Sequence, residues 1–130
     1  MSRRLISSGS FFEKKAGFYS RALVDGAWCF VSGSTGLDVE TGVLPDDIEE
    51  QCKNTLQTIE RTLTEAGFSF HDVVRVTYIL PDRTEFERCW PQLQAVFGEV
   101  RPPSTLLQAG LIDPKMRIEI EVTAYAPSKA

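Results

Sequence analysis

Two glutamates, Glu119 and Glu121, are the side chains of this sequence whose spacing best suits acid–base chemistry. They lie in residues 117–125, where apolar and polar residues alternate with the period of two that is typical of a β-strand. At about 3.3 Å per residue, the two carboxylates would lie about 6.5–7 Å apart on one face of the strand. Such a pair suits acid–base catalysis. It also suits a solvated sheet face on which Arg117 supplies the counter-charge, and the residues alone favour this second interpretation while leaving the first open.

The other reactive side chains lack partners at a useful spacing. His71 is the only histidine, with no Asp, Glu or Cys at the spacing of metal ligands, and we interpret it as a surface loop residue. Residues 32–34, Ser-Gly-Ser, do not form the Gly-x-Ser-x-Gly motif of a serine nucleophile. Cys89, next to Trp90, is more typical of packing than of a nucleophile. We therefore expect neither a metal site nor a cofactor.

Length and composition predict one globular domain over residues 1–130. The hydrophobic fraction of 42% and the charged fraction of 25% are ordinary for such a domain. The net charge of −4 argues against nucleic acid as a partner, because phosphate binding needs clustered Lys and Arg. The three cysteines form no Cys-x-x-Cys pair, and we find neither a secretory signal nor a membrane-spanning apolar run. These features predict a cytoplasmic protein with no membrane partner.

The N-terminal part of the chain is expected to form β-structure. Residues 3–7 predict a short edge strand, and residues 9–17 predict a loop. Alternation over residues 19–25, the Asp-Gly pair at positions 25 and 26, and the apolar run at residues 27–32 together predict a hairpin. The Ser-Gly-Ser segment at 32–34 is expected to end its second strand.

The first helix is marked by its caps and by its apolar stripe. Asp46 is expected to cap it, with Glu49 as the reciprocal partner, and Gly67 is expected to end it. The stripe at helical spacing predicts the buried face; its members are Ile48, Cys52, Leu56, Ile59, Leu63 and Ala66.

A central strand and a second helix follow. Residues 72–80 predict the strand, because both of its faces carry apolar residues. The second helix is expected to end near Gly98. Its first residue is open, because Pro91 would kink a helix that began well before it. Either a kinked helix begins at Thr84, or the helix begins near Trp90 after a short turn, with the proline in its first turn.

Residues 104–109 predict one more strand, which cannot begin earlier because Pro102 and Pro103 have no N–H to donate. With residues 117–125 it would form a hairpin-like unit. The order of elements predicts an α+β fold, with a mixed sheet of five to six strands and two helices on one face.

The second face of this sheet has a mixed character. It would carry Arg75, Thr77, Ile79, Glu119 and Glu121 among apolar residues from other strands. Such a face is too apolar for free solvent and too charged for the core of a monomer. It therefore predicts a homo-oligomer with polar groups facing a cleft.

An ordered set of motifs points to a family. The segments GFYSRAL (17–23), FVSGSTGLD (30–38), LTEAGFSFHDVVRVT (63–77), RPPST (101–105) and RIEIEVTAY (117–125) together resemble the RidA/YjgF family, also called endoribonuclease L-PSP-like proteins. The resemblance covers almost the whole chain. It implies a chorismate-mutase-like α+β fold assembled as a homotrimer, with clefts between neighbouring subunits.

The resemblance also implies a chemistry. In the active deaminases of that family, the cleft hydrolyses reactive imines and enamines, of the 2-iminobutanoate and 2-iminopropanoate type, to 2-keto acids and ammonia. The matching glutamate, Glu119, would position or activate water. The implied ligand-binding residues are Tyr19, Ser32, Gly33, Trp90, Ser104 and Thr105.

The arginine that binds the substrate carboxylate in those deaminases has no counterpart here. Counted back from the IEIE segment, its position holds Ser104, whereas Arg101 stands at a different place before the two prolines. Loss of a bidentate, charge-assisted contact costs about 2–4 kcal/mol, or about 30- to 1000-fold. The resemblance thus implies a deaminase-type hydrolase with an altered small-molecule substrate, or else a non-catalytic trimer that binds a metabolite or a protein.

Overall fold

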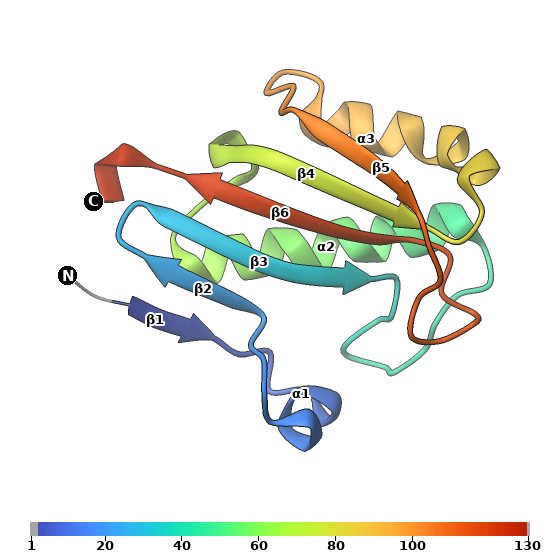
Figure 1. The fold of residues 1–130 in the computed structure, drawn as a ribbon, viewed down its shortest axis with the longest axis horizontal. Coiled ribbons are helices and arrows are strands. Elements are labelled where there is room, and N and C mark those ends of the chain that lie inside the picture. The colour runs from blue at the N-terminus through green and yellow to red at the C-terminus, as the bar shows by residue number, and fades with distance from the viewer. Residues whose placement is uncertain (1–2, 130) are drawn as a thin grey trace.

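The computed structural model describes residues 3–129, which form one six-stranded mixed sheet with helices packed behind it (Figure 1). The strands are β1 (Arg3–Ile6), β2 (Ala22–Asp25), β3 (Trp28–Thr35), β4 (Val73–Leu80), β5 (Ser104–Gln108) and β6 (Glu119–Tyr125). The α-helices are α1 (Phe11–Ala16), α2 (Ile48–Ala66) and α3 (Trp90–Phe97), and the 3-10 helices are η1 (Phe70–Asp72), η2 (Arg83–Cys89) and η3 (Pro127–Lys129). The predicted α+β class is confirmed. In the described part of the chain, no helix has the length and apolar character that crossing a membrane would require.

Strand β6 lies near the centre of the sheet, whose order is β1-β2-β3-β6-β4-β5. It runs antiparallel to both β3 and β4, while β4 and β5 are parallel. The alternation predicted for residues 117–125 is confirmed, since Ile118, Ile120, Val122 and Ala124 are buried, although β6 begins two residues later than predicted, at Glu119. These residues share one core with α2 and α3, which lie on the same side of the sheet (Figure 1). The opposite face of the sheet is left open.

Helix α2 begins one residue later than predicted. Asp47 is its cap, and the Asp47 carboxylate accepts a hydrogen bond from the backbone N–H of Glu50 at 3.2 Å. This start places Ile48 in the core, and the whole predicted stripe is buried. Asp46 instead offers its carbonyl to Arg117. Gly67 ends the helix at φ 88°, as expected for a left-handed C-cap.

The loop predicted at residues 9–17 is wrong, because these residues contain the short helix α1. Ser10 caps it, since the Ser10 hydroxyl accepts a hydrogen bond from the N–H of Glu13 at 3.1 Å. Gly17 ends it in the left-handed region at φ 71°. Two local caps therefore stabilise a helix of fewer than two turns, which no apolar periodicity in the sequence predicts.

The β2–β3 hairpin is confirmed, but its second strand does not end at residues 32–34. Strand β3 continues to Thr35 through a bulge, in which two β3 residues stand opposite one residue of β6 between the pairs Val31–Val122 and Ser34–Ile120. A Ser-Gly-Ser segment can end a strand, but here the glycine permits a bulge instead.

The predicted hairpin-like unit of the last two strands is also wrong. Strand β4 lies between β5 and β6, so these two strands do not pair with each other. The side chains of β5 are mostly exposed, whereas those of β4 and β6 alternate between exposed and buried. The strands with a fully apolar face occupy the interior of the sheet, and β5 takes its edge.

The second of the two predicted starts for the last long helix is confirmed. The 3-10 helix η2 precedes α3, which begins at Trp90 with Pro91 in its first turn. Proline is tolerated there because the first N–H groups of a helix have no partner within it.

Candidate functional site

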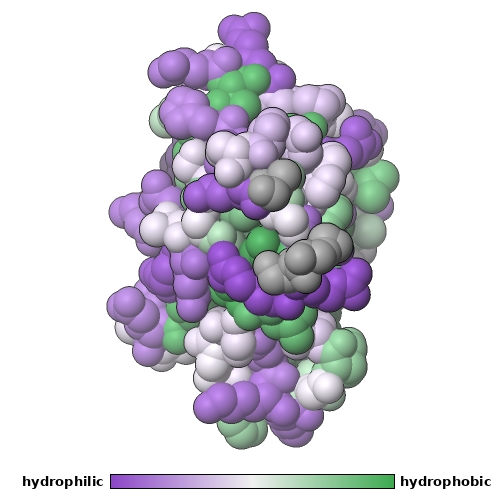
Figure 2. Space-filling view, turned by 90° about the vertical axis from the view of Figure 1, so that its left-hand side faces the viewer, coloured by the Kyte–Doolittle hydropathy of each residue, from purple (hydrophilic) through white to green (hydrophobic). Residues whose placement is uncertain are grey.

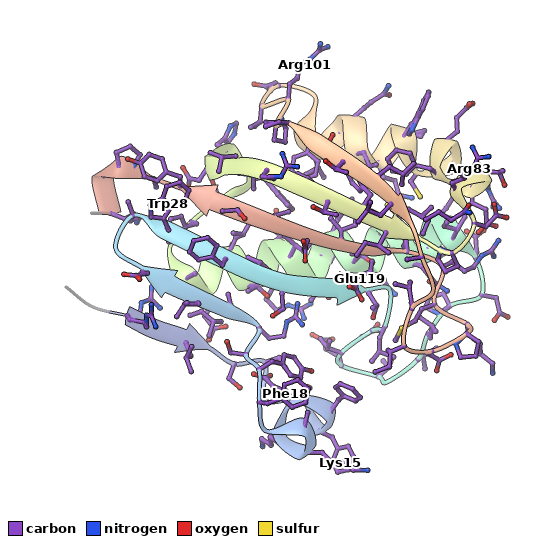
Figure 3. The ribbon with its side chains drawn as sticks, viewed as in Figure 1. Lys15, Phe18, Trp28, Arg83, Arg101 and Glu119 are labelled. Carbon is purple, nitrogen blue, oxygen red and sulfur yellow. The ribbon has the colours of Figure 1, made fainter. Side chains whose placement is uncertain are left out.

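Glu119 lies on the open face of the sheet, at the beginning of β6 (Figure 3). It stands opposite Thr35 of β3 and Ile79 of β4, and it is half-buried. Burial raises the pKa of the Glu119 carboxyl, the charge of Glu121 raises it further, and Arg21 opposes both. A carboxyl with a raised pKa exchanges protons closer to neutral pH, which suits a general base or acid.

Gly33 lies directly against this carboxylate. A Cβ at position 33 would overlap the Glu119 side chain, Oε2 first. The β3 bulge produces this close approach, and only glycine leaves the space for it. The hydroxyl of the neighbouring Ser32 donates to the carbonyl of Ser20 at 2.6 Å. The structure therefore brings Gly33 and Glu119 together, while the side chain of Ser32 fixes the backbone beside them.

Arg21 is a member of this group that the sequence did not indicate. Its Nη2 donates to the carbonyl of Ser32 at 3.1 Å and to the hydroxyl of Ser34. Both terminal nitrogens lie 3.5 Å from the carbonyl oxygen of Gly33. Its Nε is buried without a hydrogen-bond partner among residues 3–129. The alternation before the hairpin places Arg21 on a polar face, but nothing in it predicts contact with the bulge.

Tyr19 lies in an aromatic group close enough to Arg21 for the charge of Arg21 to act on its hydroxyl. Its ring centroid is 6.2 Å from that of Phe12 and 5.7 Å from that of Phe18. Burial raises the pKa of the Tyr19 hydroxyl, and the charge of Arg21 opposes this rise. Phe18 itself is 85% exposed, so the group offers an apolar surface beside a phenol.

Ser104 and Trp90 lie apart from Glu119 within one subunit. Ser104 stands opposite Val76 of β4, whereas Glu119 stands opposite Ile79. Three residues along β4 and two strand spacings across the sheet therefore separate them, about 10 Å in each direction. Trp90 begins α3, on the helical side of the sheet. Within one subunit the predicted site residues thus form two separate groups. The first lies around Glu119 and Gly33, and the second contains Trp90, Ser104 and Thr105.

Thr105 is the member of the second group that faces the open side. Its hydroxyl accepts a hydrogen bond from Arg75 at 3.0 Å, and it stands opposite Thr77. Arg101 lies farther out, at the edge of the molecule in Figure 3, where its Nε donates to the carbonyl of Gly98 at 3.1 Å. Arg101 therefore belongs to the end of α3 rather than to the Glu119 site.

The remaining reactive side chains divide in the same way. Glu121 is exposed on the open face, two residues from Glu119. Cys89 is fully buried in the core on the helical side and does not reach that face. His71 is exposed in η1, which agrees with its interpretation as a surface residue.

The family model of endoribonuclease L-PSP matches residues 13–126. The chain is 36% identical over 113 residues to a RutC family protein of Pyrococcus abyssi, covering 86% of this chain and 89% of that protein. It is 30% identical over 122 residues to the 2-iminobutanoate/2-iminopropanoate deaminase of Rattus norvegicus. That match covers 93% of this chain and 89% of the rat protein. A crystal structure of a YjgF-family protein from Mycobacterium tuberculosis shares the fold, with a TM-score of 0.86 and 36% sequence identity. The superposition covers 96% of this chain and 100% of that protein. The chain therefore belongs to the endoribonuclease L-PSP family, the RidA/YjgF family that its motifs resemble.

Proposed function

We propose that the protein hydrolyses a small imine or enamine in clefts between the subunits of a homotrimer. The observation that carries this proposal is Glu119, a half-buried carboxyl with a raised pKa that lies against Gly33. The rat relative supports the reaction class, since its name gives it as a deaminase of two small imines, 2-iminobutanoate and 2-iminopropanoate.

An aromatic cluster on the open face supports the trimer. Trp28 stacks on Phe30 at 6.1 Å and contacts Tyr125 at 4.5 Å between ring centroids, and all three are more than a third exposed. Figure 2 looks onto this end of the sheet and shows hydrophobic side chains at the surface among hydrophilic ones. Contiguous exposed apolar surface usually marks an interface. A second copy on this face could also bring its own β5 edge, with Thr105 and the neighbouring Ser104, near Glu119.

The proposed reaction needs one proton carrier. The Glu119 carboxylate takes a proton from water while the water oxygen bonds to the imine carbon. The same proton then passes to the nitrogen, which gives the carbinolamine. Glu119 next takes the proton of the carbinolamine hydroxyl and delivers it to the amine nitrogen, so that the C–N bond breaks, ammonia leaves and the carbonyl forms. The balance is imine plus water to carbonyl compound plus ammonia.

The substrate is proposed to differ from those of deaminases that carry the cleft arginine. Ser104, at the position of that arginine, offers a hydroxyl in place of a fixed positive charge. Thr105 and Tyr19 add further hydroxyl groups. Such a site favours a ligand that carries less negative charge, because an unpaired carboxylate is costly to desolvate.

The proposal is tested with enamines generated by a serine/threonine dehydratase, following 2-keto acid formation. We expect the wild type to accelerate 2-keto acid formation only weakly. Ser104→Arg should raise the rate by about 30- to 1000-fold, because it restores the charged group that binds the substrate carboxylate. Ser104→Gln is the control that adds a longer polar side chain without charge, and it should gain nothing.

Wild-type turnover equal to that of arginine-bearing relatives would refute the altered substrate. A folded trimer that accelerates neither anionic nor neutral imines, with or without Ser104→Arg, would instead favour the non-catalytic alternative, in which the cleft only binds a metabolite or a protein.

A further inference from the structure

Arg21 fixes the bulge on which Glu119 rests. Its guanidinium binds the carbonyls of Ser32 and Gly33 and the hydroxyl of Ser34, so one side chain contacts both bulge residues and the residue that follows them. Its main chain is fixed as well, because Arg21 N donates to the carbonyl of Ile6 and Ser32 N donates to the carbonyl of Arg21, both at 2.9 Å. The cation therefore has one position relative to the bulge.

This position places the charge of Arg21 behind the carboxylate of Glu119. The carboxylate packs on Gly33, and the guanidinium binds the carbonyl of the same residue from the β2 side. From its own strand and the flanking strands, Glu119 faces Glu121 on β6, Gly33 and Thr35 on β3, and Ile79 on β4. The nearby cations of the described residues are engaged elsewhere, since Arg75 of β4 donates to Thr105 and Arg117 pairs with Glu85. Arg21 is thus the group beside Glu119 that favours its ionised form.

We propose that Arg21 is a positioning residue for Glu119, which fixes the shape of the bulge at Gly33 and places a positive charge beside the carboxylate. The inference rests on the proposed function and adds to it the group that holds the Glu119 site in shape. Arg21 is not placed to anchor a ligand, because its terminal nitrogens bind the bulge and its Nε is buried. Burial lowers the pKa of Arg21, while the charges of Tyr19, Glu13 and Glu119 oppose this.

Two substitutions separate charge from shape. Arg21→Gln removes the cation, whereas Arg21→Lys keeps a cation but loses the planar fork that binds several acceptors at once. In Arg21→Gln the pKa of Glu119 should rise, because burial and Glu121 then act without opposition. In Arg21→Lys the pKa should stay near the wild-type value, while the Ser32 amide, which is bonded to the carbonyl of residue 21, should exchange faster.

The test is a carbon-13 NMR titration of labelled glutamate carboxyls, with the Glu119→Gln spectrum identifying the signal of Glu119. This readout does not depend on catalysis. The matched control is Arg4→Gln, since the Arg4 guanidinium also donates to a backbone carbonyl, that of Ala66 at 2.7 Å, but away from Glu119. The control should leave the Glu119 midpoint unchanged.

A Glu119 midpoint that does not move in folded Arg21→Gln would overturn the electrostatic role. If that variant does not fold, unchanged exchange at Ser32 in folded Arg21→Lys would overturn the positioning role. A shifted midpoint in a protein that hydrolyses no imine would uphold the role of Arg21 and count against the proposed function alone. Where activity is present, the acid limb of kcat/KM should move to higher pH in Arg21→Gln, since less of Glu119 is then ionised.

Discussion

At the residue scale, the space above Gly33 is filled by the carboxylate of Glu119. Gly33→Ala should fold, because the group that must move is the end of a flexible side chain. It should also lose about tenfold or more of any imine hydrolysis, since a displacement of about 1 Å in a catalytic group costs up to about 100-fold. Initial rates and urea unfolding check both expectations.

The control for this substitution is Gly110→Ala, where an added Cβ meets no atom within 4 Å. It should leave the rate unchanged. A Gly33→Ala variant as active as the wild type would show that the position of Glu119 on the bulge does not matter for the reaction.

The raised pKa of Glu119 also makes a prediction about stability. A carboxyl whose folded-state pKa exceeds its unfolded value contributes stability below the unfolded pKa, and this contribution is lost as pH rises through the folded pKa. Glu119→Gln stays neutral, so its free energy of unfolding should exceed that of the wild type at neutral pH. The difference should vanish in acid, where Glu119 is itself protonated.

Urea unfolding at the two pH values measures this difference. A Glu119→Gln variant that is less stable than the wild type at neutral pH would contradict the raised pKa, because it would mean that the folded state favours the charged form.

The sequence predicted part of this site directly and part of it only by resemblance. Alternation alone placed Glu119 and Glu121 on one polar strand face, and the structure confirms that face. Arg21 could not be predicted, because its contact with Ser34 depends on a bulge that no local pattern indicates. Strand propensity predicts that residues 27–32 form a strand. It does not predict the extra residue in β3 that forms the bulge and brings Gly33 against the carboxylate of Glu119.

At the scale of elements, the start of α2 gives a sharp test. Asp47→Ala should lower the free energy of unfolding by about 1 kcal/mol, because it removes the N-cap hydrogen bond. It also removes the exposed pair with Arg88 at 2.8 Å, which adds little. Urea denaturation measures the loss.

Asp46→Ala is the matched control one residue away, since Asp46 takes part through its carbonyl rather than its side chain. It should change stability by much less. Equal losses in the two variants would mean that the carboxylate of Asp47 has no special role as the cap.

The elements were more predictable than their pairing. Caps, apolar stripes and alternation predicted α2, β4 and β6 closely, because these signals lie within each segment. They could not predict that β4 separates β5 from β6. That arrangement follows from burial across the whole sheet, where the strands with a fully apolar face exclude β5 from the interior.

At the scale of the whole molecule, the aromatic cluster of Trp28, Phe30 and Tyr125 should lie in the trimer interface. Light scattering of the wild type should give the mass of three copies of the 14.5 kDa chain. Phe30→Glu should lower this mass, because a buried unpaired carboxylate disfavours association. Val39→Glu, which changes an exposed residue of the turn after β3, is the control and should stay trimeric. A monomeric wild type at micromolar concentration would remove the proposed cleft.

The most direct test of the catalytic claim compares Glu119→Gln with Glu121→Gln, two equal changes on one face of β6. The measurement is the initial rate of hydrolysis of an uncharged imine, which needs no arginine at position 104, followed across pH. We predict that Glu119→Gln loses about 100-fold or more of the acceleration, the usual contribution of a general base. Glu121→Gln should keep its rate at neutral pH and extend it to lower pH, because removing that charge lowers the pKa of Glu119. Wild-type acceleration that survives in Glu119→Gln, or falls equally in both variants, would contradict the assignment of Glu119 as the base.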